Sequence, residues 1–233
     1  MEAKRLAQMM RQCASAGRKK SITNHLFGIA LMRIRLGVFQ LHATDGYRLC
    51  RTQEPDVEQG EEAPFAVDFA EMHTIVQKHK DGSVTVMPHG NEVHVTFDDG
   101  VEYRMPNVNI NTRTASADYI CDMEPHPQTR WAAFETKHLR KLFTGWDHSE
   151  ACYLHMDGML TIKRMRDVVH QQPCDFGTEV FVEVNPRYML AALKTLGKSG
   201  YLGLHPNRIC IADTKAELPR YMHIIMPMKG KPQ

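Results

Sequence analysis

The sequence predicts an α+β protein built from two similar halves, each with two helices and several antiparallel strands. The first observation is that apolar residues repeat at helical spacing in four segments, and alternate with polar residues between them, as in half-buried strands. The second is that the order helix, strands, helix, strands is completed twice, each time over roughly a hundred residues, an ordinary domain size. Identity between the halves is negligible, so the repeat lies in the order of the elements.

The first half contains two helices with strands after each. Leu6, Met9 and Cys13 recur at helical spacing, which predicts a helix over 2–14 with Gly17 as a stop. Asp68 is suited to cap a second helix that ends before residue 81. Residues 53–63 are acidic and polar, as in an exposed loop. The predicted strands are 29–34, 38–43, 48–52, 84–87, 92–97 and 101–105.

The second half repeats this order after an aperiodic stretch at 107–127. A helix is predicted over 135–145, and another opens with Asn185 as cap and Pro186 in the first turn and ends near 197–200. The predicted strands are 151–155, 160–166, 179–184, 201–204, 208–212 and 221–226. We therefore expect one domain over 1–115, a connector over 116–125 and a second domain over 126–233.

Length and composition are those of an ordinary globular protein. The 233 residues can bury a sizeable core, and 42% apolar with 24% charged residues are average values. No apolar run is long enough to span a bilayer, and the amphipathic start of the chain does not resemble a signal peptide. We expect a cytoplasmic protein. Because the net charge is only +2, a nucleic-acid-binding surface would need its basic residues gathered on one side.

Cysteine and histidine patterns give no sign of a metal or cofactor site. The six cysteines include no CxxC pair, which favours reduced thiols in strands or core. The thirteen histidines form no HExxH and no paired cluster at ligand spacing. We expect no metal and no cofactor.

The polar faces of the four predicted helices are basic. On the fourth, Arg187, Lys194 and Lys198 follow one stripe opposite its apolar residues. A single stripe of this kind is usually a solvated face, but four in a near-neutral protein favour sequence-independent contact with phosphates. No aromatic residues are interleaved, so duplex is favoured over single strands. The residues expected to face DNA are Lys4, Arg5, Arg11, Lys78, Lys80, Lys137, Arg140, Lys141, Arg187, Lys194 and Lys198.

Two further segments are unusual. In the run 41–49, a strand leads into Thr44-Asp45-Gly46, which alone indicates only a turn, but the following Tyr-Arg-Leu is left unexplained. The run 221–229 is an apolar strand that passes into Met226-Pro227-Met228. This second pattern is typical either of a last core strand with a frayed tail or of a protein-binding patch, since methionine adapts to varied partners.

Taken in order, these segments resemble the bacterial DNA polymerase III β subunit, the DNA sliding clamp. That family has an A-T-D-G-H-R-L motif, which 43–49 resembles, and a V-V-M-P-M-R-like tail, which 224–229 resembles. The segment 184–190 is similar to the family's N-V-x-Y-L stretch. Ala117-Asp118-Tyr119, followed by Pro125, is similar to its P-D-Y-x-x-x-x-P link. The resemblance covers nearly the whole chain.

The resemblance implies a DNA-clamp fold, in which each domain packs two helices on two antiparallel sheets and domains close into a ring with helices lining the hole. It implies a non-enzymatic processivity factor that encircles duplex DNA in replication and tethers a DNA polymerase, a clamp loader and other proteins through short peptide motifs. The implied pocket residues are Leu26, Thr44, Gly46, Tyr47, Arg48, Leu49, Asn185, Tyr188, Ile224, Ile225, Met226, Pro227, Met228 and Lys229.

The sequence departs from the family in several respects. The family has three domains per chain, and this chain resembles only the second and third, so a six-domain ring would need a head-to-tail homotrimer, an arrangement that hints at a phage-like source. Tyr47, Ala117 and Lys229 replace the family's His, Pro and Arg, so the partner motif can differ. The alternative is a clamp-like adaptor or decoy that binds clamp-interacting peptides without encircling DNA. A nuclease has little support, because Asp98-Asp99 and Asp147-His148 are isolated pairs.

Overall fold

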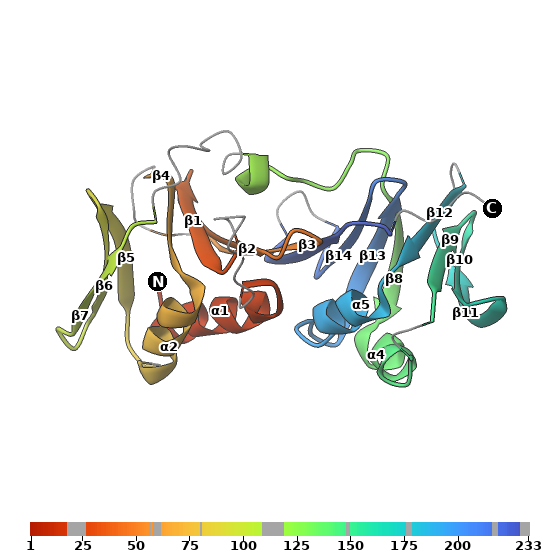
Figure 1. Cartoon of the computed structure of the whole chain (residues 1–233), viewed down its shortest axis with the longest axis horizontal. Coiled ribbons are helices and arrows are strands. Elements are labelled where there is room, and N and C mark those ends of the chain that lie inside the picture. Colours follow the sequence, from red (N-terminus) through yellow and green to blue (C-terminus); the bar gives the residue numbers. More distant parts are fainter. Residues whose placement is uncertain are drawn as a thin grey trace. The chain divides into compact units, whose positions relative to one another are not determined.

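The computed structural model describes residues 1–17, 27–55, 57, 62–79, 81–108, 119–147, 150–175, 179–215 and 219–228. The chain divides into two units, Met1–Met123 and Glu124–Gln233 (Figure 1). Each unit combines helices with antiparallel sheets, so the predicted α+β class is confirmed.

Unit 1 has a helix, four strands, a second helix and three strands. The first four strands form a sheet in the order β4-β1-β2-β3, and the last three form a sheet in the order β5-β6-β7, with all pairs antiparallel. The elements are α1 (Ala3–Gly17), β1 (Ile29–Arg35), β2 (Val38–Thr44), β3 (Arg48–Glu54), β4 (Glu62–Asp68), α2 (Phe69–Lys78), β5 (Val84–His89), β6 (Glu92–Phe97) and β7 (Glu102–Pro106).

Unit 2 has the same order of helices and strands as unit 1, preceded by one additional strand. Its antiparallel sheets have the orders β12-β9-β10-β11 and β15-β14-β13-β8. The elements are β8 (Arg130–Glu135), α4 (Thr136–Thr144), β9 (Cys152–Met156), β10 (Met159–Arg164), β11 (Asp167–Pro173), β12 (Val180–Val184), α5 (Pro186–Leu193), β13 (Ser199–His205), β14 (Arg208–Ala212) and β15 (Tyr221–Ile225). In both units the fourth of the four consecutive strands pairs with the first: β4 pairs with β1, and β12 pairs with β9. The two units therefore share the same strand topology.

The helices of each unit cover the apolar faces of its sheets. In unit 1, α1 packs on β2, β3 and α2, with Leu6, Met9, Met10 and Cys13 fully buried. Each such side chain contributes about 1.5–3 kcal/mol by leaving water. In unit 2, α4 and α5 pack together. The Asn185 side chain caps α5 by accepting a hydrogen bond from the backbone N–H of Arg187 at 2.9 Å.

The sheet of β1 and β2 is also covered on the face away from α1. Ile29 and Leu31 of β1 form a small apolar cluster with Ile120 and Cys121, which lie within the predicted connector. The guanidinium of Arg33 fixes this segment by donating to a carboxylate oxygen of Asp122 at 2.7 Å and to the carbonyl of Cys121 at 3.3 Å. The sheet is therefore buried on both sides here.

Three strands were not predicted, and one helix was predicted too long. β4 contains Pro64, which the strand accommodates because it lies at the edge of its sheet. β11 carries mostly exposed or half-exposed polar residues and has no clear alternation. β8 is short and falls between the predicted aperiodic stretch, which ends at 127, and the predicted helix, which begins at 135. α5 ends at Leu193, so Lys194 is its C-cap and Lys198 lies beyond the helix, contrary to prediction.

Candidate functional site

The helix pair α4 and α5 of unit 2 presents a basic surface. Five of the predicted residues lie on these helices or at the α5 C-cap, and the sixth, Lys198, lies four residues after Lys194. All six are exposed, and none is in an ion pair within the part of the chain that the structure describes. The only carboxylate beside them on these elements is Glu135, at the start of α4. The six residues are Lys137, Arg140, Lys141, Arg187, Lys194 and Lys198.

The helix pair α1 and α2 of unit 1 is less basic than predicted. Lys4, Arg11 and Lys78 are exposed, whereas Arg5 is not free. Its Nε donates to a carboxylate oxygen of Glu54 at 2.5 Å and its Nη2 donates to the carbonyl of Gln53 at 3.0 Å. This side chain therefore holds α1 to β3, and its contact with DNA stays a prediction. Lys80 lies outside the described residues.

The turn after β2 is held by its own side chains. The Thr44 hydroxyl donates to the carbonyl of Arg48 at 2.8 Å and accepts from the N–H of Gly46 at 3.1 Å. The buried Asp45 carboxylate accepts from the N–H of Tyr47 at 3.2 Å and from Nε of Arg48 at 3.2 Å. The predicted residues 44 and 46–48 are thus brought together in one compact turn.

The turn is also fixed to the rest of unit 1. Nη2 of Arg48 donates to the carbonyl of Ser15 near the end of α1, where helix carbonyls lack intrahelical partners. Gly46 has φ +86°, and a Cβ there would lie 2.4 Å from Cζ of Phe27, so glycine is required. Arg48 holds the turn to α1, and Leu49 is buried in the core of unit 1. Tyr47 is 59% exposed, so its side chain is accessible to solvent.

The tail splits at residue 225 into a core part and an exposed part. Ile224 and Ile225 of β15 are buried in the core of unit 2, so they offer little side-chain surface to a peptide. Met226 and Met228 are 45% and 49% exposed, with Pro227 half-buried between them. The segment is therefore a core strand up to residue 225 followed by two exposed methionines, and a protein-binding role for those methionines stays a prediction.

The exposed tail lies close to the start of α5. The N–H of Met228 donates to the carbonyl of Glu183 at 2.8 Å, forming an isolated antiparallel bridge with β12. Glu183 precedes Asn185, the α5 cap, by two residues, and the half-buried Tyr188 lies in the first turn. The structure thus brings the tail, Asn185 and the first turn of α5 together within unit 2. Leu26 and Lys229 lie outside the described residues.

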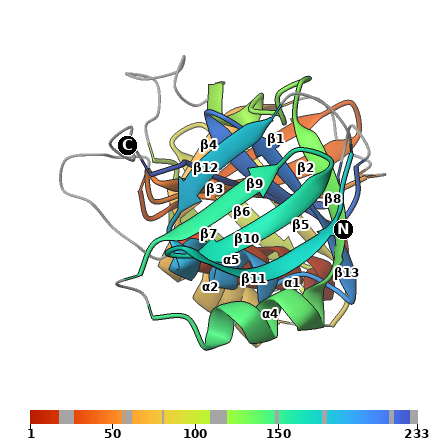
Figure 2. The same ribbon diagram turned by 90° about the vertical axis from the view of Figure 1, so that its right-hand side faces the viewer.

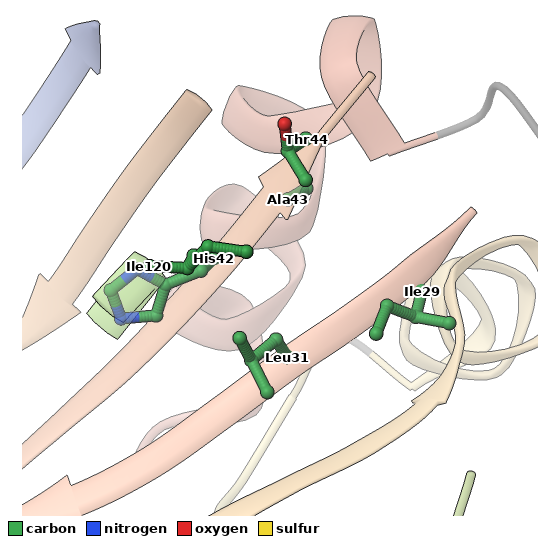
Figure 3. Close-up of a pocket in the computed structure, with 6 residues that line it drawn as sticks. All are labelled: Ile29, Leu31, His42, Ala43, Thr44 and Ile120. Atoms are coloured by element: carbon green, nitrogen blue, oxygen red, sulfur yellow. The ribbon is translucent and has the colours of Figure 1, made fainter. Parts of the chain in front are cut away.

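A small pocket next to the Thr44 turn was not predicted. It lies in unit 1 on the face of the sheet away from α1 (Figure 3). Its centre is His42, which is fully buried and whose two ring nitrogens have no hydrogen-bond partner among the described residues. The available signal was the alternation of Gln40, His42 and Thr44 on one face of β2. The lining residues are Ile29, Leu31, His42, Ala43, Thr44 and Ile120.

The His42 pocket predicts a pH dependence of stability. Burial, and then the guanidinium groups of Arg51 and Arg33, hold the pKa of His42 well below its ordinary value of 6.5. The unfolded chain therefore binds a proton as the pH falls below 6.5 while folded His42 stays neutral, which lowers stability by up to about 1.4 kcal/mol per pH unit. We expect the free energy of urea unfolding to fall between pH 7.5 and 5.5, and His42→Leu to remove part of that fall. An equal fall in both proteins would contradict this assignment.

The part of the chain that the structure describes contains no group of three or more His, Cys, Asp or Glu side chains placed to hold a metal. The Asp98 carboxylate accepts from the N–H of Ser83 at 2.9 Å, which makes it a turn residue, and His148 lies outside the described residues. Among the described helices none is long and apolar enough to cross a membrane.

Comparison with known proteins bears on the fold. No family model and no curated protein matches the sequence. The β subunit of DNA polymerase III from Pseudomonas aeruginosa is 15% identical with a TM-score of 0.78, over 98% of this chain and 65% of that one. The Thermotoga maritima β subunit is 19% identical with a TM-score of 0.78, over 99% and 65%. The C. crescentus β sliding clamp is 16% identical with a TM-score of 0.75, over 99% and 65%.

These matches confirm, at the level of the fold, the resemblance that the motifs carried. They extend over almost every residue of the chain, which spans about 65% of the length of the structures it matches. The helix pairs and paired antiparallel sheets of both units are the architecture that the clamp fold required. This chain therefore has the fold of the bacterial DNA polymerase III β subunits, the sliding clamps.

Proposed function

We propose that this chain is the subunit of a DNA sliding clamp, a non-enzymatic ring that encircles duplex DNA and tethers replication proteins to it. The observation that carries the proposal is the clamp fold combined with a helix pair whose exposed residues are cationic and unpaired among the described residues. A ring held on DNA by closure needs only weak phosphate contacts. Six exposed cations on and beside α4 and α5 supply such contacts without reading bases.

The ring would be assembled head to tail from three copies of this chain. Each chain supplies two clamp units, so a ring of six units requires three chains with heterologous contacts. β7 and β11 are sheet-edge strands, each paired on one side within the described residues. Unpaired strand edges are templates for pairing with another chain. At the opposite edges of these two sheets, Glu183 of β12 bridges Met228 and Ser83 before β5 bridges Glu2, so we assign the contact between copies to β7 of one chain and β11 of the next.

A proline in β11 tests this assembly. Val168 is 52% exposed, and Val168→Pro removes a backbone donor from the edge. Light scattering of the wild type should give a mass of three chains of 26.7 kDa, about 80 kDa, and the variant should be monomeric. The matched control is Leu36→Asn, an exposed residue with φ 51°, where asparagine is tolerated. A monomeric wild type would favour the adaptor, and a variant with wild-type mass would contradict the β11 contact.

Replication proteins would bind through short peptides at the exposed tail. Met226 and Met228 are flexible apolar side chains beside the first turn of α5, where Asn185 and Tyr188 lie. Short motifs with apolar anchors bind such surfaces through a few buried side chains. In unit 1, Gly46 and the exposed Tyr47 are the proposed contributors from the Thr44 turn. The polymerase and the clamp loader are the proposed partners.

A further inference from the structure

The outward face of β9 and β12 in unit 2 carries two aromatic side chains, one half-buried and one exposed. Figure 2 turns the sheet β12-β9-β10-β11 toward the viewer. The rings of Tyr153 and Phe181 stack with centroids 5.5 Å apart and an interplanar angle of 17°, and Phe181 is 56% exposed. The other face of these strands is buried against the unit's core, as at Leu154 and Val182. A solvated sheet face is usually polar, so a stacked aromatic pair here requires an explanation.

The exposed tail extends this aromatic pair. Residues paired across antiparallel strands project their side chains to the same face, and so do residues two apart along a strand. Glu183 pairs with Tyr153 on one side and with Met228 on the other, and Phe181 lies two residues before Glu183. Tyr153, Phe181 and Met228 therefore share one face, and we call these three side chains the aromatic patch. Met228 is 49% exposed, so the patch continues the proposed peptide site.

Among the described residues, the charges around the patch are mainly negative. A carboxylate oxygen of Glu179 lies 2.8 Å from Nε2 of His155, and one of Asp157 lies 3.9 Å from the same atom. Glu183 pairs with Tyr153 within the patch, and the ring of His155 is 6.3 Å from that of Phe181. Lys163, which pairs with Tyr153 from the β10 side, is the basic residue next to these carboxylates. Phosphates would be repelled from this face, and cations attracted.

We propose that the aromatic patch is a docking surface for an extended partner segment in which an apolar or aromatic residue is followed by an arginine or lysine. The apolar residue would cover the Tyr153 and Phe181 rings, and the cation would lie over a ring face and near Glu179 or Glu183. This inference rests on the proposed function, because it lengthens the peptide site at Met228. It adds to the partner motif an apolar or aromatic residue that is followed by an arginine or lysine.

Peptide selection on the full-length protein tests the patch. A display library of random peptides of about 12 residues is selected on the wild type, and the isolated peptides are synthesised for fluorescence anisotropy. We expect an apolar residue followed by Arg or Lys to be enriched. Phe181→Ser should weaken these peptides about tenfold or more, as should the double change Glu179→Lys and Glu183→Lys. Replacing the peptide's cation with glutamate should restore binding to the charge-reversed protein. The control Met165→Ser, 61% exposed in the same unit, should leave affinity unchanged.

Three outcomes would overturn the inference, and they differ in what else they affect. If peptides bind, lose affinity with Met226→Ala and ignore both the Phe181 and the charge-reversal variants, the patch has no role and the proposed function stands. If no peptide binds, or if none responds to Met226→Ala, both the patch and the peptide-tethering function fail. If Phe181→Ser lowers the mass of the assembly by light scattering, the patch is a contact between copies of the chain.

Discussion

Glutamine at four exposed basic positions of α4 and α5 is expected to weaken binding to duplex DNA by about 100-fold at physiological salt. The four positions are Lys137, Arg140, Arg187 and Lys194. Each contact with a phosphate releases counterions and contributes about 0.9 to the slope of log affinity against log salt. Loss of four contacts should therefore reduce that slope by about 3 to 4. Anisotropy titrations of a labelled duplex at several salt concentrations measure both effects.

The matched control changes the same number of charges away from the helices. Arg35, Lys163, Arg166 and Lys215 lie in strands and turns, and their replacement by glutamine changes the net charge equally. We expect this control to bind DNA within about threefold of the wild type, because long-range charge is screened beyond about 8 Å at physiological ionic strength. Equal losses in both variants would show that only net charge matters, and the assignment of α4 and α5 to the DNA would then be wrong.

Alanine at both Met226 and Met228 is expected to abolish binding of partner peptides, with a loss of about 100-fold or more. Apolar anchors in a small interface carry about 2 kcal/mol or more each. The fold should tolerate the change, because both side chains are about half exposed and only the backbone of Met228 pairs with β12. Anisotropy with selected peptides measures the loss, and thermal unfolding should shift by no more than about 2 °C.

The contrasting variant is Ile225→Ala, one residue earlier. Ile225 is fully buried, so we expect this change to lower the free energy of unfolding by about 2–4 kcal/mol and to leave the affinity of the folded protein for peptides nearly unchanged. Retention of full peptide affinity by the double methionine variant would remove the tail from the proposed site.

The helices and most strands could be predicted because their apolar spacing is regular. Leu6, Met9 and Cys13 marked α1, and Asn185-Pro186 marked the start of α5 to the residue. β4 and β11 could not be predicted, because an edge strand tolerates proline and polar residues that break the alternation.

The roles of single side chains were predicted less well than the segments that carry them. Arg5 lies on the expected basic helix, but its guanidinium forms an ion pair with Glu54 of β3. Ile224 and Ile225 lie in the expected tail, but only a structure could show that Ile225 is the last buried residue and that Met226 is exposed. His42 was missed because the alternation of Gln40, His42 and Thr44 does not show that this face of β2 is covered or that the ring lacks a partner there. These properties depend on contacts between residues far apart in the sequence.

Whether the chain closes into a ring around a central opening is best tested by electron microscopy of the purified full-length protein. We predict class averages with a closed ring of six similar densities, contributed by three chains, around a hole wide enough for a double helix. Particles without an opening would contradict the proposal that this chain encircles DNA. So would isolated two-unit particles at a concentration where light scattering gives the mass of three chains.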